Sequence, residues 1–332
     1  MSLLRRAAIA ALALAAACSS SSPSATSVSS SATPPPASAT TTTVATTTTA
    51  KPSRWAAVPT GGTVAAVVTP NGFTVPVTSV NTDGSYVVQT PCDHAATTTG
   101  DPLYGANVVL DPGHGGIDPG AVGPSGLQEK VVNLAVANEV KRILEADGAT
   151  VVLTREQDQN TTLATRDALA VALHPQAYVS IHHNAEPDGL TADGSPGNET
   201  YYQIANPRSK RLAGILWEEV TKAFEAYHVA WMGDTDHGAK YRAGANGDYY
   251  AVLRQTEGID TVLSEAAFIT DPAEEALLSS LDFQHVEAQA IATAIERFLG
   301  TDDPGSGFVT PYDRTEPAGG GGTSVGCTDP EL

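Results

Sequence analysis

From residue 105 onward, apolar residues follow two alternating patterns. Short continuous apolar runs, which suit buried strands, are separated by segments in which apolar residues return every three or four positions, as on one face of a helix. The expected strands are 107–111 (NVVLD), 150–155 (TVVLTR), 177–184 (AYVSIHHN), 199–203 (ETYYQ) and 261–266 (TVLSEA). The expected helices are 129–148, 162–173, 209–224, a helix that begins at Pro272, and 284–299. This alternation predicts an α/β fold in which a mixed β-sheet is flanked by helices on both faces.

The helix that begins at Pro272 has a recognisable start. Asp271 is its expected N-cap, Pro272 occupies the first helical position, and Glu274 follows three residues after the cap. An acidic residue at that third position typically reaches back to the N–H of the cap residue.

A different pattern precedes the α/β region. Residues 61–92 hold short β-branched runs that are broken by Pro-Asn-Gly and Thr-Asp-Gly, and such dipeptides supply the positive φ of tight hairpins. We therefore expect a small β-meander with a linker over 53–104, a main domain over 105–300 and a Gly-rich tail over 301–332.

The N-terminal residues resemble a bacterial export signal. Residues 2–18 carry Arg5 and Arg6, then an apolar run too short to span a membrane, then small residues that end at Cys18. Ala-Ala-Ala-Cys fits ordinary Ala-x-Ala cleavage and also resembles a lipobox, and the cysteine favours a lipoprotein over plain secretion. Residues 19–52 are almost wholly Ser, Thr, Ala and Pro, which predicts a disordered stalk. The expected location is extracytoplasmic, in the cell envelope.

The cysteine content predicts a disulfide. Past Cys18, the chain of 332 residues has only Cys92 and Cys327, and in an exported protein we expect these two to form a disulfide, with two free thiols as the alternative. The bond would restrict the unfolded chain by roughly 4 to 5 kcal/mol in the entropic model.

A formal net charge of −19 argues against a nucleic-acid partner. Membrane contact is expected only through a lipid on Cys18.

Three polar residues lie where expected strands end, and a fourth lies where the first helix begins. His114 follows the first strand, His182 and Glu265 end later strands, and Glu129 begins the helix after the first loop. Ligands bind outside the carboxyl ends of strands in open α/β sheets, so the four could converge there. Two histidines and a carboxylate that leave one position open are what a catalytic zinc needs. A further glutamate could take a proton from the attacking water.

Each of these residues also has a structural interpretation. His114 could be a surface residue of a Gly-rich turn, and the helix macrodipole alone favours Glu129 at a helix N-terminus. His183 is expected to point away from the site because consecutive strand residues face opposite sides. Glu265 lies in an apolar segment, where an unpaired carboxylate is costly and indicates a functional neighbour. The four together are more specific than any one alone.

The motifs that surround these residues resemble one known family. The chain between about Val108 and Leu299 is similar to the zinc-dependent N-acetylmuramoyl-L-alanine amidases (amidase type 3). The similarity lies in the motifs VVLDPGHGGIDPGAVG, EKVVNLAVA, VVLTREQDQNTTLATRDALA, VSIHHNA and VLSEAAFITDPAEEALL. The β-rich segment that precedes them resembles the actinobacterial branch of this family. The resemblance implies one zinc ion held by His114, Glu129 and His182, with Glu265 as the catalytic residue. One departure is Glu-Ala-Ala-Phe-Ile-Thr-Asp at 265–271, where the family more often has Gly before Phe and Ser-Asn after it.

The implied function is hydrolysis of the amide bond between N-acetylmuramic acid and L-alanine in peptidoglycan. Asn184 is a candidate for orienting a zinc ligand. Arg155 and Arg166 match recurrent arginines of the family, and we interpret them as ion-pair partners within the scaffold, with binding of a stem-peptide carboxylate as the alternative. The loops 185–198 and 228–247 are expected at the rim of the site.

Two rival functions stay open at this point. The first is a non-catalytic wall-binding or amidase-regulating protein, which the complete set of four polar residues disfavours. The second is a zinc carboxypeptidase or deacetylase that acts on the same polymer, which fits the order of residues less well. The sequence does not determine the oligomeric state.

Overall fold

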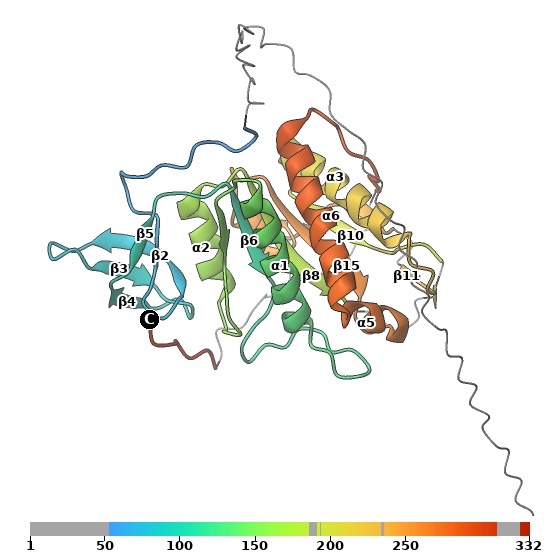
Figure 1. Cartoon of the computed structure of the whole chain (residues 1–332), viewed down its shortest axis with the longest axis horizontal. Helices are drawn as coiled ribbons and strands as arrows, with labels where there is room; N and C mark the ends of the chain where they lie inside the picture. Colours follow the sequence, from blue (N-terminus) through green and yellow to red (C-terminus); the bar gives the residue numbers. More distant parts are fainter. Residues whose placement is uncertain (1–52, 186–190, 193, 234–235, 311–325) are drawn as a thin grey trace, which may run out of the picture. The chain divides into compact units, whose positions relative to one another are not determined.

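A six-stranded mixed sheet forms the centre of the main domain (Figure 1). The computed structural model describes residues 53–185, 191–192, 194–233, 236–310 and 326–332. The expected export signal, Cys18 and the stalk lie outside these residues. The strands of the sheet, in spatial order, are β12 (Gly238–Lys240), β10 (Glu199–Tyr202), β15 (Thr261–Phe268), β8 (Ala177–Asn184), β6 (Val108–Pro112) and β7 (Val151–Leu153).

Strand direction decides where the site can form. β7, β6, β8 and β15 are mutually parallel, so their carboxyl ends meet at one edge of the sheet. β10 runs antiparallel to β15, and β12 is parallel to β10. The sheet is therefore mixed, as predicted, and its central strands deliver the residues after Pro112, Ile181 and Ser264 to one edge.

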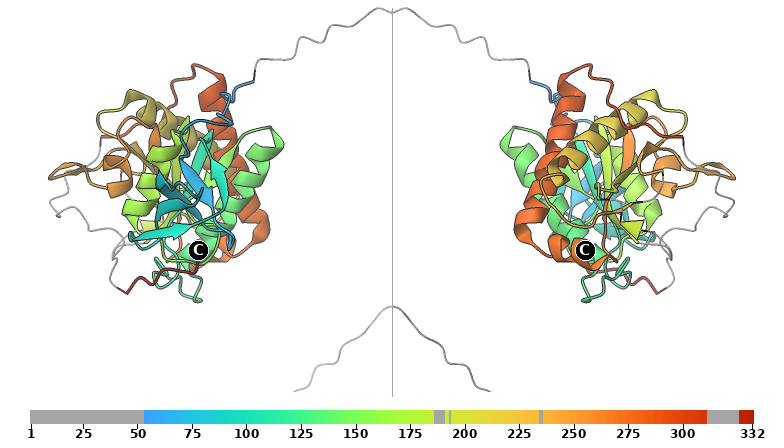
Figure 2. Two further views of the ribbon diagram at one scale, coloured as in Figure 1. Left: turned by 90° about the vertical axis from the view of Figure 1, so that its left-hand side faces the viewer. Right: turned by 90° about the vertical axis from the view of Figure 1, so that its right-hand side faces the viewer.

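Helices cover both faces of this sheet, which confirms the predicted fold class. One face carries α1, α3 and α6, and the other carries α2 and α4 (Figure 2). The helices are α1 (Glu129–Ala146), α2 (Leu163–Leu173), α3 (Pro207–Phe224), α4 (Ala251–Arg254), α5 (Pro272–Leu278) and α6 (Leu281–Gly300).

The apolar run of β8 reflects burial on both faces. Val179 and Ile181 pack in the core beneath α1 and α6, whereas Tyr178 packs in the second core beneath α2. Parallel strands that are covered on both sides have this continuous apolar character. On α1, the spacing of Val132, Val136 and Val140 places one buried stripe against the sheet.

Several elements differ from the predictions. The last helix begins at Leu281, three residues earlier than expected, and α4 was not predicted. The expected rim loops contain short strands: β9 (Thr191–Ala192), β11 (Met232–Gly233), β12, β13 (Ala243–Gly244) and β14 (Gly247–Asp248). These strands are two or three residues long and α4 has four residues, which is too short for a periodic apolar signal.

The β-rich segment forms a separate antiparallel sheet. Its order is β4-β3-β2-β1-β5, with β1 (Ala66–Val68), β2 (Thr74–Val80), β3 (Tyr86–Gln89), β4 (Ala95–Thr98) and β5 (Asp101–Leu103). β1, β2 and β3 pair in succession within residues 61–92, where the meander was expected, and β4 extends this pairing beyond Cys92. Gly72 adopts φ +81° in the Pro-Asn-Gly turn. The residues expected to be a linker instead contain β4 and β5, and β5 pairs with β1.

The end of the chain is held against this small sheet. Cys92 and Cys327 form a disulfide, which confirms the predicted pair. The Asp329 carboxylate accepts a hydrogen bond from the Cys92 N–H at 2.8 Å and pairs with His94 Nδ1 at 2.7 Å. Leu332 packs on the core of the small sheet. Among the residues that the structure describes, no helix is long and apolar enough to cross a membrane.

Candidate metal centre

The turn after β6 brings the first site histidine into position. His114 adopts φ +60°, a left-handed conformation that is uncommon outside glycine and is often retained at functional sites. The preceding residue must be glycine for a steric reason, since a Cβ on Gly113 would lie 2.1 Å from Cε1 of His182. The Gly-His pair therefore allows the turn to pass directly over the end of β8.

Three of the predicted site residues converge. His114 Nε2 lies 3.0 Å from Glu129 Oε2, and His182 Nδ1 lies 3.0 Å from Glu129 Oε1. One ligand atom from each of the three residues lies within 4.8 Å of the others. The Glu129 side chain is 4% exposed, whereas the His114 side chain is 25% exposed, so the cluster is open to solvent on the histidine side.

Asp118 orients His114 from the side of the ring that faces away from Glu129. Asp118 Oδ2 lies 2.8 Å from His114 Nδ1, which leaves Nε2 to face the cluster. Burial alone would lower the pKa of His114, but hydrogen bonds to Asp118 and Glu129 outweigh it and raise that pKa to about 10. For Glu129, burial is likewise outweighed by hydrogen bonds from both histidines, which hold its pKa well below the usual range. Burial lowers the pKa of His182.

Glu265 lies one strand away from His182. The two residues are register partners on the parallel strands β15 and β8, so their side chains lie on the same face of the sheet. Glu265 does not belong to the group of three, and its Oε2 is buried without a hydrogen-bond partner. Burial, reinforced by the nearby carboxylates of Glu129 and Glu199, raises the pKa of Glu265 well above its usual value.

His183 points away from this cluster, as its strand position predicted. Its Nδ1 lies 2.7 Å from Asn133 Oδ1, and its Nε2 lies 3.1 Å from Glu287 Oε2. Asn133 in turn donates to Glu129 Oε1 at 3.1 Å. His183 therefore supports Glu129 through Asn133 from within the core.

The two arginines serve the turn that carries His114. Arg166 forms a buried ion pair with Asp111 at 2.7 Å and also donates to the His114 carbonyl at 2.6 Å. Burial alone would raise the pKa of Asp111, but the charge of Arg166 and the hydrogen bonds it receives lower that pKa to about 2. Arg155 departs from the prediction, because its hydrogen bonds run to backbone carbonyls, including those of Pro112 and Gly113, and not to a carboxylate.

Asn184 also departs from the prediction. Its Nδ2 donates to Glu199 Oε2 at 3.1 Å, and not to His114, Glu129 or His182. Glu199 is the register partner of Glu265 on β10 and accepts from buried Lys240 at 2.7 Å and from the Tyr201 hydroxyl at 2.6 Å. Asn184 thus belongs to the surroundings of Glu265. No local pattern in the sequence marks Glu199 or Lys240.

Asp118 was also missed, although a signal for it exists. It follows His114 by four residues in the same Gly-rich turn, and histidine ligands commonly donate the N–H of their second ring nitrogen to a carboxylate.

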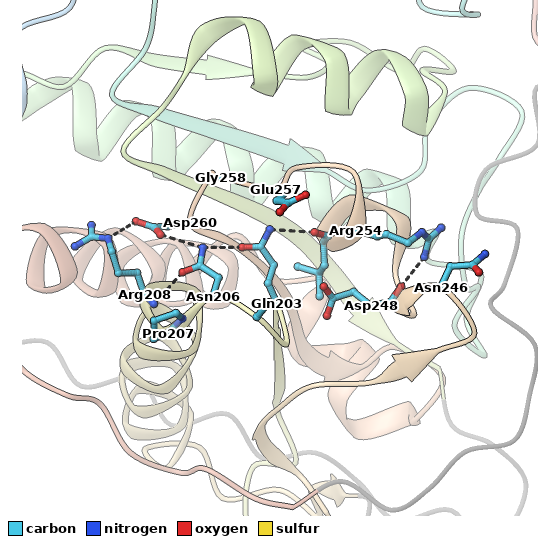
Figure 3. Close-up of a pocket in the computed structure, with 13 residues that line it drawn as sticks. Gln203, Asn206, Pro207, Arg208, Asn246, Asp248, Arg254, Glu257, Gly258 and Asp260 are labelled. Atoms are coloured by element: carbon cyan, nitrogen blue, oxygen red, sulfur yellow. Dashed lines mark hydrogen bonds and ion pairs between the residues drawn. The ribbon is translucent and has the colours of Figure 1, made fainter.

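A separate pocket of about 620 Å³ lies at the other end of the sheet (Figure 3). It is lined by residues around the start of α3, by β14 and by the end of α4 with the residues that follow it, among them Gln203, Arg208, Arg254 and Asp260. Tyr202 pairs with Val262 near the start of β15, whereas Glu265 lies three residues further toward the carboxyl end of that strand. The pocket contains none of the predicted site residues.

Comparison with known proteins identifies the family. Residues 108–297, more than half of the chain, match the family model for N-acetylmuramoyl-L-alanine amidase. The chain therefore belongs to this family. The match begins at β6 and ends within α6, so it includes all four predicted site residues.

Individual relatives agree with this assignment. The chain is 32% identical over 244 residues to the N-acetylmuramoyl-L-alanine amidase AmiC of Neisseria meningitidis, covering 63% of this chain and 58% of that protein. It is 34% identical over 210 residues to the uncharacterized protein YqiI of Bacillus subtilis, covering 63% of this chain and 90% of the relative. Thus the chain spans about three fifths of the length of the Neisseria relative and most of the Bacillus one.

A solved structure has the same fold. The N-acetylmuramoyl-L-alanine amidase of Clostridium difficile 630 is 28% identical, with a TM-score of 0.51, over 60% of this chain and 99% of that one. Placement within an actinobacterial branch stays a prediction.

Proposed function

We propose that this protein is a zinc-dependent peptidoglycan hydrolase that cleaves the amide bond between N-acetylmuramic acid and L-alanine of the stem peptide. The observation that carries the proposal is the convergence of His114, Glu129 and His182, with Glu265 on the adjacent strand. Family membership supports the choice of bond.

The residues present fit one zinc ion. Two imidazole nitrogens and a carboxylate are the donor set of catalytic zinc sites, which keep a further position open. The hydrogen bond between Asp118 and His114 fixes which nitrogen faces the cluster, as expected for a ligand histidine. His114, Glu129 and His182 would hold the ion, which when bound would polarise the scissile carbonyl and lower the pKa of a water towards about 7.

Glu265 would act as the general base and then as the general acid of the reaction. Its raised pKa and unpartnered oxygen suit a group that takes a proton from the attacking water and then returns it to the amine of the departing alanine. The water oxygen becomes part of the muramic lactyl carboxylate, and the stem peptide leaves with a free N-terminal alanine. Glu199 and its partner Lys240 would keep this side of the site polar and fixed.

Substitution of the ligands tests the metal centre. His114→Ala or His182→Ala should lower the zinc content of the purified protein sharply, measured by elemental analysis, while the Glu156→Ala control, outside the site, should keep it. Stoichiometric zinc in either histidine variant would contradict the assignment.

Digestion of purified peptidoglycan tests the reaction. An amidase exposes a free carboxylate on the lactyl group of muramic acid and releases stem peptides that begin with alanine. New carboxyl ends within the stem peptide would indicate a carboxypeptidase, free acetate a deacetylase, and no release a wall-binding protein.

We also propose that the protein acts outside the cytoplasm, in the cell envelope. The support is the expected signal at residues 2–18 and the Cys92–Cys327 disulfide, which suits an oxidising compartment. Two relatives from Staphylococcus are named probable cell wall amidases. A lipid tether on Cys18 is tested by Cys18→Ala, which should move the protein from the membrane fraction to the soluble one.

A further inference from the structure

The first turn of α5 contains two adjacent buried glutamates. Glu274 is 1% exposed and Glu275 is 2% exposed. Carboxylates are rarely buried to this extent without specific partners. Here backbone N–H groups from three other segments donate to them.

Glu275 holds the loop that leads to the metal ligand Glu129. The Ser125 N–H donates to both carboxylate oxygens of Glu275, at 2.9 and 2.8 Å, and the Leu127 N–H donates to Oε1 at 3.1 Å. A Cβ on Gly123 would lie 2.2 Å from the same oxygen, so the loop closes tightly around the carboxylate. Glu275 therefore holds the chain within two residues of Glu129.

The loop is also tied to Glu129 itself. The Glu129 N–H donates to the Ala121 carbonyl, and the Ala121 N–H donates to Glu129 Oε2, both at 2.9 Å. Because Glu275 fixes the middle of the loop and Glu129 fixes its ends, a shift of the loop would move the ligand carboxylate.

Glu274 holds a different part of the site. It does not serve as the predicted capping partner, since the Asp271 N–H donates to the Phe268 carbonyl. Its own oxygens accept from Met232 N–H at 2.5 Å and Phe268 N–H at 2.7 Å. Phe268 ends β15, and the pairing of β15 with β8 is irregular between Glu265 and Phe268. Such irregularities re-aim side chains and need support from their surroundings.

We propose that Glu275 and Glu274 are positioning residues with separate targets: Glu275 fixes the loop that places Glu129, and Glu274 fixes the strand end that places Glu265. This inference rests on the proposed function, in which Glu129 holds zinc and Glu265 moves the proton. Neither glutamate belongs to the cluster of metal ligands.

The alternative is that both residues only stabilise the fold. Their burial is nearly equal, so a purely structural role predicts that their removal has similar consequences. If the two residues have separate targets, their removal should have different consequences. Loss of Glu275 should weaken metal binding, whereas loss of Glu274 should slow turnover of the metal-loaded enzyme.

The experiment compares Glu275→Gln, Glu274→Gln and the exposed control Glu225→Gln in the full mature chain. Zinc affinity is measured by chelator competition, and kcat is measured with a soluble muropeptide at saturating zinc. Glu275→Gln should weaken zinc binding by about 10- to 100-fold, the usual effect of losing a group that orients a ligand. Glu274→Gln should bind zinc as wild type does but lose at least about 10-fold in kcat, a fraction of the worth of general acid-base catalysis. Glu225→Gln should match wild type in both.

Hydrogen exchange of the metal-free protein gives a readout that needs neither zinc nor substrate. Faster exchange in Glu275→Gln should be confined to residues 121–128, and in Glu274→Gln to residues near Met232 and Phe268. If wild type fails to bind zinc or to cleave, the proposed function fails, and this exchange pattern still decides the inference.

Two results would overturn the inference. One is parallel loss of zinc affinity and kcat in both variants, with exchange faster throughout the domain. The other is wild-type behaviour in both. Should Glu275→Gln not fold, Glu275→Asp, which keeps the charge but is one methylene shorter, undergoes the same measurements.

Discussion

Gly113→Ala is a small change that should disable the metal centre. The new Cβ would lie 2.1, 2.2 and 2.6 Å from Cε1, Nε2 and Nδ1 of His182, whereas ordinary van der Waals contact begins at 3.4 Å. The backbone at Gly113 does not have a positive φ, so the contact with the imidazole is the source of the effect.

The size of the effect follows from these distances. The His182 ring or the turn must move by about 1.3 Å to restore normal contact, whereas zinc–ligand distances tolerate about 0.2 Å. We expect zinc affinity to fall at least about 100-fold, which corresponds to about 2.7 kcal/mol. Overpacking should also destabilise the metal-free fold by about 1 to 3 kcal/mol.

Chelator competition on the purified variant gives the affinity, and thermal unfolding of the metal-free protein gives the change in fold stability. Gly61→Ala is the matched control, because a Cβ there meets no atom within 4 Å and its φ is not positive. Wild-type zinc affinity in Gly113→Ala would refute the account of why the turn requires glycine.

Three further predictions concern protons and the disulfide. Glu265→Gln should keep its zinc and its fold while kcat falls by about two to four orders of magnitude, and undiminished kcat would exclude Glu265 as the proton carrier. Because the pKa of metal-free His114 is raised to about 10, this residue is protonated at neutral pH, so zinc binding at pH 7 should release about one proton from it and tighten as pH rises. Calorimetry in buffers of different ionisation enthalpy measures that release, and a pH-independent affinity between pH 6 and 8 would contradict it. Reduction of the Cys92–Cys327 bond, which spans 235 positions, removes up to about 5.5 kcal/mol of entropic stabilisation and should lower the melting temperature while activity at moderate temperature persists; two alkylatable thiols in the unreduced mature protein would show that the bond is absent.

The sequence alone predicted the parts of the fold that rest on periodicity. Strand β8 is buried on both faces and helix α1 on one face, and in both elements the spacing of apolar residues indicates which positions are buried. The direction of β10 could not be predicted in the same way, because the residues ETYYQ fit a parallel and an antiparallel partner equally well. The strands of two or three residues beyond β8 have no period to detect.

Some residues of the candidate site could likewise be predicted from the sequence, and others could not. His114, Glu129, His182 and Glu265 could be identified because they are polar residues at the ends of predicted elements. Glu275 could not, since it binds backbone N–H groups about 150 positions away, and such donors occur at every residue except proline. Arg155 was misread for the same reason, because its partners are backbone carbonyls.

The bond that is cleaved is tested most directly by the fate of the water oxygen. The purified protein is incubated with a defined muropeptide in water enriched in oxygen-18, and the products are analysed by mass spectrometry. Our account predicts one heavy oxygen in the lactyl carboxylate of the muramic acid product and none in the released stem peptide, which begins with alanine. Heavy oxygen in the peptide or in free acetate, or no hydrolysis by the zinc-loaded protein, would contradict it.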